Sequence, residues 1–490
     1  MDYEAVIGLE THVQLKTKSK MWCGCANEFG APPNSHVCPV CLGMPGVLPV
    51  ANEEALRLTA LTGLLLNCTV TRYAKFDRKN YFYPDMPKNY QITQYDKPST
   101  ISGWVEFEFG GGLARVRVTR AHLEEDVGKN FHFERNSGVD FNRAGVPLME
   151  IVSEPDITSA DMAYEYLNAL KDILVYGGVS DCDMEKGMVR CDVNVSVRPK
   201  GQTELGAKIE IKNMNSFSGV RKALEYEIPR QTEVLKQGGK LIQSTRRWDD
   251  AAGITEEMRT KEHAHDYRYF PEPDLMPFQP TDAWLSEVKS RIVELPLARK
   301  QRFMRDYQLP ASDAQTFVWD VPLGNYFEGI ARQAKHPTAA ANWVINNLRA
   351  LMADASIFML VEPGADPVDK RLLSFANLKF KPEGILEIVE LVDSGKISTK
   401  MAQDVFVEMF TTGEAPAKIV EKKGLAQVSD EGAIERFCDQ AIAANPGPVA
   451  DYRAGKAAAL NFLKGQVMKL SKGKANPALA GEILERKLKG

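Results

Sequence analysis

The sequence predicts an α+β protein, with an antiparallel sheet in the first part of the chain and helices in the rest. Two observations support this class. Residues 5–15 and 188–197 alternate apolar and polar side chains, which is typical of strands that place one face on a core. Beyond about residue 293, apolar residues recur with helical spacing instead. A chain of 490 residues is long enough for two or three hydrophobic cores.

The first predicted strand carries chemically useful groups on one side. Glu10, His12 and Gln14 share a face, opposite an apolar face. A solvent-facing strand usually shows Lys, Thr and Ser, so a carboxylate two residues from an imidazole indicates a metal or phosphate site. The alternative is a Glu and a His that are only hydrogen-bonded or solvated.

Four of the eight cysteines form two close pairs, Cys23-Gly-Cys25 and Cys38-Pro-Val-Cys41. Two such pairs across a short loop can present four thiolates in a tetrahedron, which predicts a structural Zn²⁺ site. His36 is a possible substitute ligand, and four reduced thiols are the alternative. The cysteines are too few for a disulfide scaffold in so long a chain.

A helical pattern covers residues 52–66, and residues 72–95 then interleave seven aromatic with five basic side chains. Aromatic rings stack on bases while Arg and Lys bind phosphates, which suits a single-stranded nucleic-acid end. A loop packed by its own rings explains the composition equally well.

Residues 104–109 and 113–119 predict a hairpin around three glycines. The hairpin leads into a second ionisable cluster, whose members are His122, Glu124, Glu125 and Asp126.

Two later strands repeat the pattern of the first. The strand at 188–197 sets Arg190, Asp192 and Asn194 on one face, and residues 208–212 set Lys and Glu on one side. A sheet with one apolar and one ionisable face could form a cradle for a metal nucleotide. An ordinary solvated sheet explains residues 208–212 adequately.

The parts of the chain outside the predicted strands show helical spacing, and the whole chain divides into three predicted domains. Helices are expected at 160–176 and 217–236, and prolines close the first domain, 1–293. A helical domain, 294–410, and a helical tail domain, 411–490, follow, with a hinge at 411–417. Further helices are expected at 287–292, 297–307, 326–332, 341–352 and 372–376, with a loop at 363–367.

The tail is locally basic. From residue 452 to 490 there are nine Lys and Arg and two Glu, a balance of 9 − 2 = +7, against 61 − 65 = −4 for the chain. Such a patch predicts phosphate binding, although a solvated basic face is the alternative. The candidate contacts are Lys456, Lys464, Lys469, Lys472 and Lys474.

Standard motifs are absent. Residues 201–208 miss a P-loop because the Lys is one place late, and there is no dinucleotide fingerprint or Gly-x-Ser-x-Gly elbow. Any ATP chemistry would therefore use the carboxylate-rich sheet, and any ammonia would come from a partner. No stretch suits a membrane span or a signal peptide, so we expect a cytoplasmic protein without membrane contact.

Four blocks together resemble a known family. Residues 8–15, 76–85, 140–156 and 266–274 are similar to the B subunit of the tRNA-dependent aspartyl/glutamyl amidotransferase, in the expected order along the chain. The resemblance implies ATP-dependent phosphorylation of the side-chain carboxyl of Glu-tRNA(Gln) or Asp-tRNA(Asn), followed by amidation. It also implies a glutamine-synthetase-like cradle, and a heterotrimer in which an amidase subunit supplies ammonia and a third, small subunit holds the complex together. For the basic tail, 411–490, the resemblance implies binding of the tRNA body.

The resemblance further implies an essential Mg²⁺ held by Glu10, His12, Glu125 and Glu150. Glu124 could replace Glu125, because spacing alone does not choose between neighbours. We hypothesise that this ion bridges the ATP phosphates and the substrate carboxylate. An imidazole is an unusual Mg²⁺ ligand, so His12 could bind through water or favour Mn²⁺.

Weaker candidates for contacts with ATP phosphates or the tRNA end are Lys79, Lys88, Arg190, Asp192 and Asn194. Each of the cations could instead be an ordinary surface charge. Two competing hypotheses stay open at this point. One is a non-catalytic, zinc-containing tRNA-binding scaffold, and the other is a free-standing ATP-dependent ligase that uses free ammonia.

Overall fold

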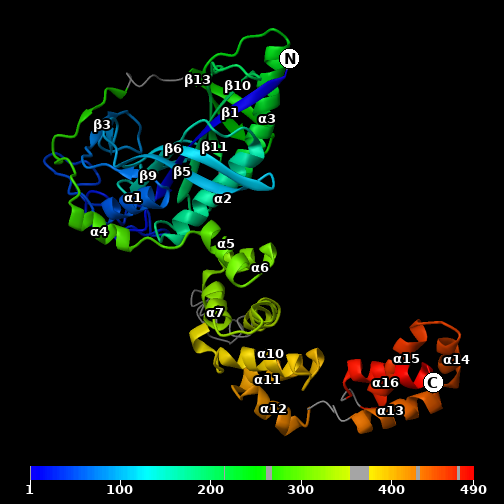
Figure 1. Ribbon diagram of the computed structural model, residues 1–490. Coiled ribbons are helices and arrows are strands. Elements are labelled where there is room, and N and C mark those ends of the chain that lie inside the picture. The colour runs from blue at the N-terminus through cyan, green and yellow to red at the C-terminus, as the bar shows by residue number, and fades with distance from the viewer. Residues whose placement is uncertain are drawn as a thin grey trace. The chain divides into compact units, whose positions relative to one another are not determined.

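The computed structural model describes residues 2–214, 216–260, 267–353, 375–425, 431–471 and 475–489. The chain divides into two compact units, Met1–Leu297 and Ala298–Gly490. The first unit combines sheets with covering helices, and the described part of the second unit is helical (Figure 1). The predicted mixture of a sheet-containing part and a helical part is therefore confirmed.

Strand β1 (Tyr3–Gln14) lies inside a nine-stranded sheet of order β13-β12-β11-β10-β1-β9-β6-β5-β2. Its neighbours, both antiparallel, are β10 (Val189–Pro199) and β9 (Pro147–Ser153). The other strands are β2 (Thr69–Val70), β5 (Thr100–Phe109), β6 (Gly112–Glu125), β11 (Ile209–Met214), β12 (Ser244–Asp249) and β13 (Ile254–Thr260). The hairpin expected at 104–119 is β5 and β6, and β6 continues through the second ionisable cluster.

The sheet departs from the prediction at one edge, because β11 and β12 run parallel. The chain between them contains helix α3 (Phe217–Lys236), and a helical crossover is the usual connection between parallel neighbours. All other ladders among the described strands of this sheet are antiparallel.

Helices α1 (Glu53–Leu65), α2 (Ala160–Tyr176) and α3 pack against the apolar side of the sheet (Figure 1). The core joins Ile7 and Leu9 of β1 to helix side chains such as Tyr166, all at most 1% exposed. Each fully buried apolar side chain contributes about 1.5–3 kcal/mol. Because the helices occupy this face, Glu10 and His12 are left on the opposite one. The helices expected at 52–66, 160–176 and 217–236 are confirmed.

Two small sheets complete the first unit. One has the order β14-β3-β4, formed by Phe270–Pro271, Asp77–Asn80 and Tyr90–Thr93. The other pairs β7 (Lys129–His132) with β8 (Ser137–Asp140). The aromatic and basic stretch at 72–95 is therefore built around two short strands rather than one loop.

The described helices beyond residue 281 begin with α4 (Asp282–Ser290), α5 (Pro296–Asp306), α6 (Ala311–Trp319), α7 (Val321–Ala331), α8 (Pro337–Asn342) and the π-helix Trp343–Leu348. They continue with the 3₁₀ turn Phe375–Asn377, α10 (Glu383–Asp393), α11 (Thr399–Thr412) and α12 (Pro416–Lys423). The last four are α13 (Glu431–Ala444), α14 (Pro446–Arg453), α15 (Ala458–Leu470) and α16 (Pro477–Lys489).

The helices predicted at 287–292, 297–307, 326–332 and 341–352 correspond to α4, α5, α7 and the α8–π-helix segment, with shifted ends. For example, α7 begins earlier because the Asp320 side chain accepts a hydrogen bond from the Leu323 N–H. The sequence prediction missed α6, α10 and α11. The expected loop at 363–367 and residues 372–374 lie outside the described part of the chain.

The hydrophobic core of the second unit has two clusters, one from Phe303 to Val420 and one from Ile434 to Leu488. The predicted hinge at 411–417 covers the end of α11, the short connection and the start of α12, and both helices share the first cluster. Gly413, with φ +79°, ends α11, and α12 then buries Ile419 and Val420 in that cluster. These contacts group α12 with the helices of the first cluster. No helix among the described residues is long and apolar enough to cross a membrane.

Candidate active site

The polar face of the sheet carries a first cluster of His12, Glu124 and Glu150. Glu150 lies directly opposite His12 on one side and opposite His122 on the other. Alternate residues of a strand share a face, so Glu124 projects on the same side as His122. The Nδ1 atom of His12 is 2.9 Å from Oε1 of Glu124. His12, Glu124 and Glu150 each place a potential ligand atom within 4.8 Å of the others.

The charges of the first cluster depend on one another. Burial lowers the pKa of His12, but the hydrogen bond and charge of Glu124 outweigh burial and raise it to about 9. The pKa of Glu124 falls to about 2, because His12 outweighs the opposing effect of burial. Burial lowers the pKa of His122 to about 3, so that ring is neutral. A cation that binds His12 must therefore displace its proton.

A second carboxylate cluster adjoins the first and contains Glu10, Asp192 and Glu210, again within 4.8 Å. Glu10 lies opposite Asp192 on the neighbouring strand. Asn194 donates to Oε1 of Glu10 at 2.8 Å, and Lys212 Nζ lies 2.5 Å from Asp192 Oδ2. Glu10 thus belongs to a different group from His12 and Glu150. Glu210 was not predicted as a site residue, because the alternation at 208–212 also fits a solvated strand.

Glu125 lies apart from both clusters. Its buried carboxylate pairs with Lys88 and accepts a hydrogen bond from the Ile92 N–H at 2.9 Å. As the neighbour of Glu124 on one strand, it points to the other side of the ribbon. The structure thus brings Glu124, and not Glu125, to His12. Lys88 is likewise occupied by an ion pair and does not face the first cluster's carboxylates.

Arg190 lies opposite His12 and joins a neighbouring network. Its Nη2 donates to Asp126 Oδ1 at 2.7 Å, and Gln14 Nε2 donates to Asp126 Oδ2 at 2.9 Å. The Arg190 side chain is 40% exposed, so part of the guanidinium can still reach an anion. The pKa of Asp126 is lowered, because nearby cations and hydrogen bonds outweigh its burial.

Lys79 is a further cation near the first cluster. Its Nζ lies 4.9 Å from the centre of the Tyr267 ring. Burial lowers the pKa of Lys79, but interactions with Tyr269 and Glu124 outweigh burial and raise it. Among the residues that the structure describes, no carboxylate lies within ion-pair distance of its ammonium group. Lys79 is therefore protonated, and its charge acts on Glu124 and Glu150 of the first cluster.

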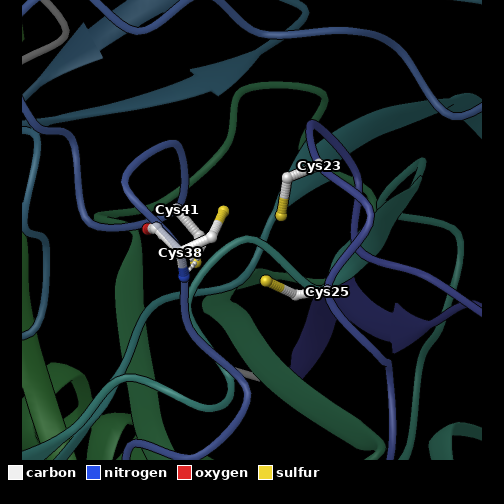
Figure 2. A group of neighbouring side chains, drawn as sticks. All are labelled: Cys23, Cys25, Cys38 and Cys41. Carbon is white, nitrogen blue, oxygen red and sulfur yellow. Dashed lines mark hydrogen bonds between the residues drawn. The ribbon is translucent and has the colours of Figure 1, made fainter.

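The four predicted zinc ligands converge (Figure 2). The Sγ atoms of Cys23, Cys25, Cys38 and Cys41 all lie within 4.8 Å of one another, and none is in a disulfide. The Cys38 N–H donates to Cys41 Sγ at 3.1 Å, which orients that sulfur. This donor set fits a closed tetrahedral Zn²⁺ site, and it does not include His36.

A buried lysine supports the cysteine group. Lys20 is 0% exposed and its Nζ donates to the Phe141 carbonyl at 3.2 Å. Hydrogen bonding from Cys23 is the main cause that lowers the pKa of Cys41 to about 4, and the charge of Lys20 acts in the same direction. Lys20 would thus offset part of the negative charge that the four thiolates would carry around a metal ion. Sequence spacing gives no signal for this residue.

The predicted tail lysines have different surroundings. Lys456 Nζ pairs with Asp451 at 2.9 Å, Lys464 is half-buried against Gly481, and Lys469 is exposed. Lys472 and Lys474 lie outside the described residues. The expected apolar face of α15 is confirmed, since Leu460, Leu463 and Val467 are buried.

Comparison with known proteins agrees with this architecture. The chain matches the GatB/GatE catalytic domain over residues 5–286 and the GatB domain over residues 325–488. It is 51% identical to the B subunit of the aspartyl/glutamyl-tRNA(Asn/Gln) amidotransferase of Carboxydothermus hydrogenoformans, over 99% of both chains. It is 50% identical, over the full length of both chains, to proteins of the same description from Thermoanaerobacter sp. and Caldanaerobacter subterraneus.

The sheet with its carboxylate clusters is thus the catalytic-domain portion of an amidotransferase subunit. The chain belongs to the GatB family, the B subunits of aspartyl/glutamyl-tRNA(Asn/Gln) amidotransferases. This confirms the resemblance seen in the four sequence blocks. In the last of these blocks, 266–274, residue 266 lies outside the described residues.

Proposed function

We propose that this chain phosphorylates the side-chain carboxyl of Glu-tRNA(Gln), Asp-tRNA(Asn) or both with ATP, and then amidates it. The observation that carries the proposal is the pair of adjoining carboxylate clusters on one sheet face, linked by Glu10 and His12 of β1. The names of the relatives, which specify tRNA(Asn/Gln) amidotransferases, support this substrate class.

The first cluster would hold one divalent cation through His12, Glu124 and Glu150, and the second would hold another through its three carboxylates. Mg²⁺ bound there would neutralise charge on the transferring phosphoryl group. The fit is chemical, because five of the six side chains offer hard oxygen ligands and each cluster contains one buried carboxylate. Asn194 and Lys212 hold the carboxylates of the second cluster in place.

The substrate carboxylate and the ATP phosphates are both negative and repel each other. Positive side chains near the first cluster would reduce this repulsion. Lys79 and the exposed part of Arg190 both border the first cluster and can bind phosphate oxygens. The substrate carboxylate oxygen then attacks the γ-phosphorus and ADP leaves. Ammonia attacks the resulting acyl phosphate at carbon, and inorganic phosphate departs with the attacking carboxylate oxygen.

The other parts have supporting functions in this proposal. The polar sheet face is the glutamine-synthetase-like cradle, and the cysteine group holds a structural Zn²⁺. The amidase subunit delivers ammonia, and the third, small subunit completes a cytoplasmic heterotrimer.

The tail binds the tRNA body, and we place its boundary after residue 425 instead of at 411. Removal of residues 426–490 should weaken tRNA binding about tenfold or more, through loss of phosphate contacts. Unchanged affinity would contradict this assignment.

ADP formation tests the catalytic proposal. The purified heterotrimer is mixed with Glu-tRNA(Gln), ATP and Mg²⁺, and wild type is compared with Glu124→Gln and, as a control with the same chemical change, Glu154→Gln outside both clusters. Glu124→Gln should lower ADP formation at least about 100-fold while tRNA binding persists. Full turnover in Glu124→Gln would refute the site.

The same assay separates the two alternatives. A tRNA-binding scaffold leaves ATP intact even in the wild-type complex. A free-standing ligase forms the amide from free ammonia without the amidase subunit. The pair of half-buried His12 and buried Glu124 favours catalysis over a scaffold, because withdrawing such ionisable groups from water is costly and is typical of functional sites.

A further inference from the structure

A surface of aromatic and basic side chains borders the first cluster, and the proposed chemistry does not use it. We call it the aromatic platform and define it as the exposed Phe82, Tyr83 and Arg268 with the half-buried Tyr267 and Tyr269. Phe82 is 69% exposed and Tyr83 is 52% exposed. Single exposed rings are normal, but several rings with an arginine over one of them indicate a binding surface.

The platform joins two segments distant in sequence. The Arg268 guanidinium lies 5.9 Å from the centre of the Phe82 ring, and Tyr267 packs edge-on against Tyr269 with 6.1 Å between ring centres. Pairing of β14 with β3 fixes the second segment beside the first. A bidentate ion pair between Arg78 and Glu272, at 2.7 and 2.8 Å, strengthens that junction.

The backbone at Arg268 is held in an unfavourable conformation. Its φ of +47° lies in the left-handed region, which a long side chain rarely adopts. The Asn80 side chain donates to the carbonyl oxygens of Tyr267 and Arg268, at 3.1 and 2.8 Å, and so clamps this turn. Strain of this kind persists where a particular placement is needed. Here the placement is a guanidinium over an exposed ring.

Lys79 connects the platform with the first cluster. Lys79, on β3, has its ammonium 4.9 Å from the Tyr267 ring centre, and its charge also interacts with Glu124 and Glu150. In an aminoacyl-tRNA, only a few covalent bonds separate the side-chain carboxyl from the terminal ribose. A carboxyl that reaches the cluster therefore brings the last unpaired bases to the neighbouring surface.

We propose that the aromatic platform binds the single-stranded 3′ end of the aminoacyl-tRNA, with bases stacked on Phe82 and Tyr83 and Arg268 contacting a phosphate or a base face. The inference rests on the proposed function and specifies how its substrate is held. Aromatic rings and arginine recognise unpaired bases in this way. The openness of the rings favours an RNA end over the adenine of ATP, since small-molecule sites bury most of their ligand.

Photo-crosslinking tests the location directly. The intact heterotrimer is irradiated with a tRNA whose 3′-terminal nucleotide is 8-azidoadenosine, and the labelled peptides are identified. The proposal expects adducts within residues 81–83 or 267–269. Adducts confined to other parts of the chain would overturn it. This readout does not depend on ATP turnover, so failure of the platform and failure of the catalytic proposal are distinguishable.

Binding measurements supply the matched variants. Phe82→Ala and Arg268→Ala should each weaken binding of intact tRNA about 5- to 100-fold, the range expected for one lost stacking contact. Neither substitution should change the affinity for tRNA trimmed of its single-stranded 3′ end. Phe82→Trp, which keeps an aromatic ring, should bind intact tRNA as the wild type does. Phe133→Ala is the control, because Phe133 is 63% exposed outside the platform. The proposal is overturned if Phe133→Ala has an equal effect, if trimmed tRNA is equally affected, or if only ATP binding weakens.

Discussion

Replacing Arg78 with methionine should loosen the β14 segment from β3. The guanidinium makes two charge-assisted hydrogen bonds to Glu272, whose side chain is 0% exposed, while Arg78 itself is 19% exposed. Methionine retains much of the apolar stem but leaves a buried carboxylate without its cation. Breaking a buried pair from one side costs about 3–5 kcal/mol.

Hydrogen exchange measures this cost locally. The Glu272 N–H donates to the Phe76 carbonyl at 2.9 Å and exchanges only when the segment opens. At about 1.4 kcal/mol per tenfold change, Arg78→Met should accelerate its exchange roughly 100- to 4000-fold. Adding Glu272→Gln should recover most of the protection, because it removes the unpaired charge.

An exposed cross-strand pair provides the control. Arg115 and Glu106 are 57% and 38% exposed, with 3.0 Å between their bonded atoms. Arg115→Met should change local opening by less than about 1 kcal/mol, or about fivefold. The reasoning is refuted if Arg78→Met leaves exchange near Glu272 at the wild-type rate, or if Arg115→Met has a comparable effect on its own strands.

Three further predictions follow from buried groups. Lys20→Met should weaken zinc retention about tenfold in chelator competition, because a compensating charge is lost, whereas exposed Lys18→Met should not. Burial opposes ionisation of Glu227, but its hydrogen bonds, first to Arg230, outweigh burial and lower its pKa below the ordinary 4.5. The stability that this ionised carboxylate contributes is present above pH 4.5 and is lost as pH falls below it. Glu227→Gln should therefore flatten the acid dependence of amide hydrogen exchange in α3. Gly103→Ala would place a Cβ 2.3 Å from a buried sulfur and should destabilise the protein by about 1–3 kcal/mol in denaturant unfolding, whereas Gly112→Ala meets open space.

The sequence was informative where local rules decide structure. Helices α2 and α3 lie at the predicted positions, and the side chains of Ser159 and Ser216 cap their first turns. Period-two alternation placed Glu10 and His12 on one face, and it did the same for the polar residues of β10. In each case the backbone periodicity and the fate of the apolar face are set by a few neighbouring residues.

Details of the site depended on strand register, which sequence spacing does not determine. Glu124 and Glu125 are neighbours, and a slip of one residue would exchange their faces. Only the pairing of β6 with β9 shows that Glu124 faces His12 while Glu125 meets Lys88. The separation of Glu10 from the first cluster has the same origin, because it depends on which strand lies on each side of β1.

The platform could be anticipated only in part. The aromatic and basic composition of 72–95 indicated nucleic-acid binding, but equally a self-packed loop. Arg268 and Tyr269 come from a segment far along the chain, and their placement depends on the β14–β3 pairing and the Asn80 clamp. Such long-range contacts leave no periodic signal in the sequence.

Oxygen transfer from the substrate tests the central claim most directly. Glu-tRNA(Gln) labelled with ¹⁸O in both side-chain carboxyl oxygens is converted by the intact heterotrimer with ATP and glutamine, and the inorganic phosphate is analysed by mass. Phosphorylation of the carboxyl at this site predicts one ¹⁸O atom in each phosphate released with the amide product. Phosphate free of ¹⁸O, formed alongside the amide, would contradict the account.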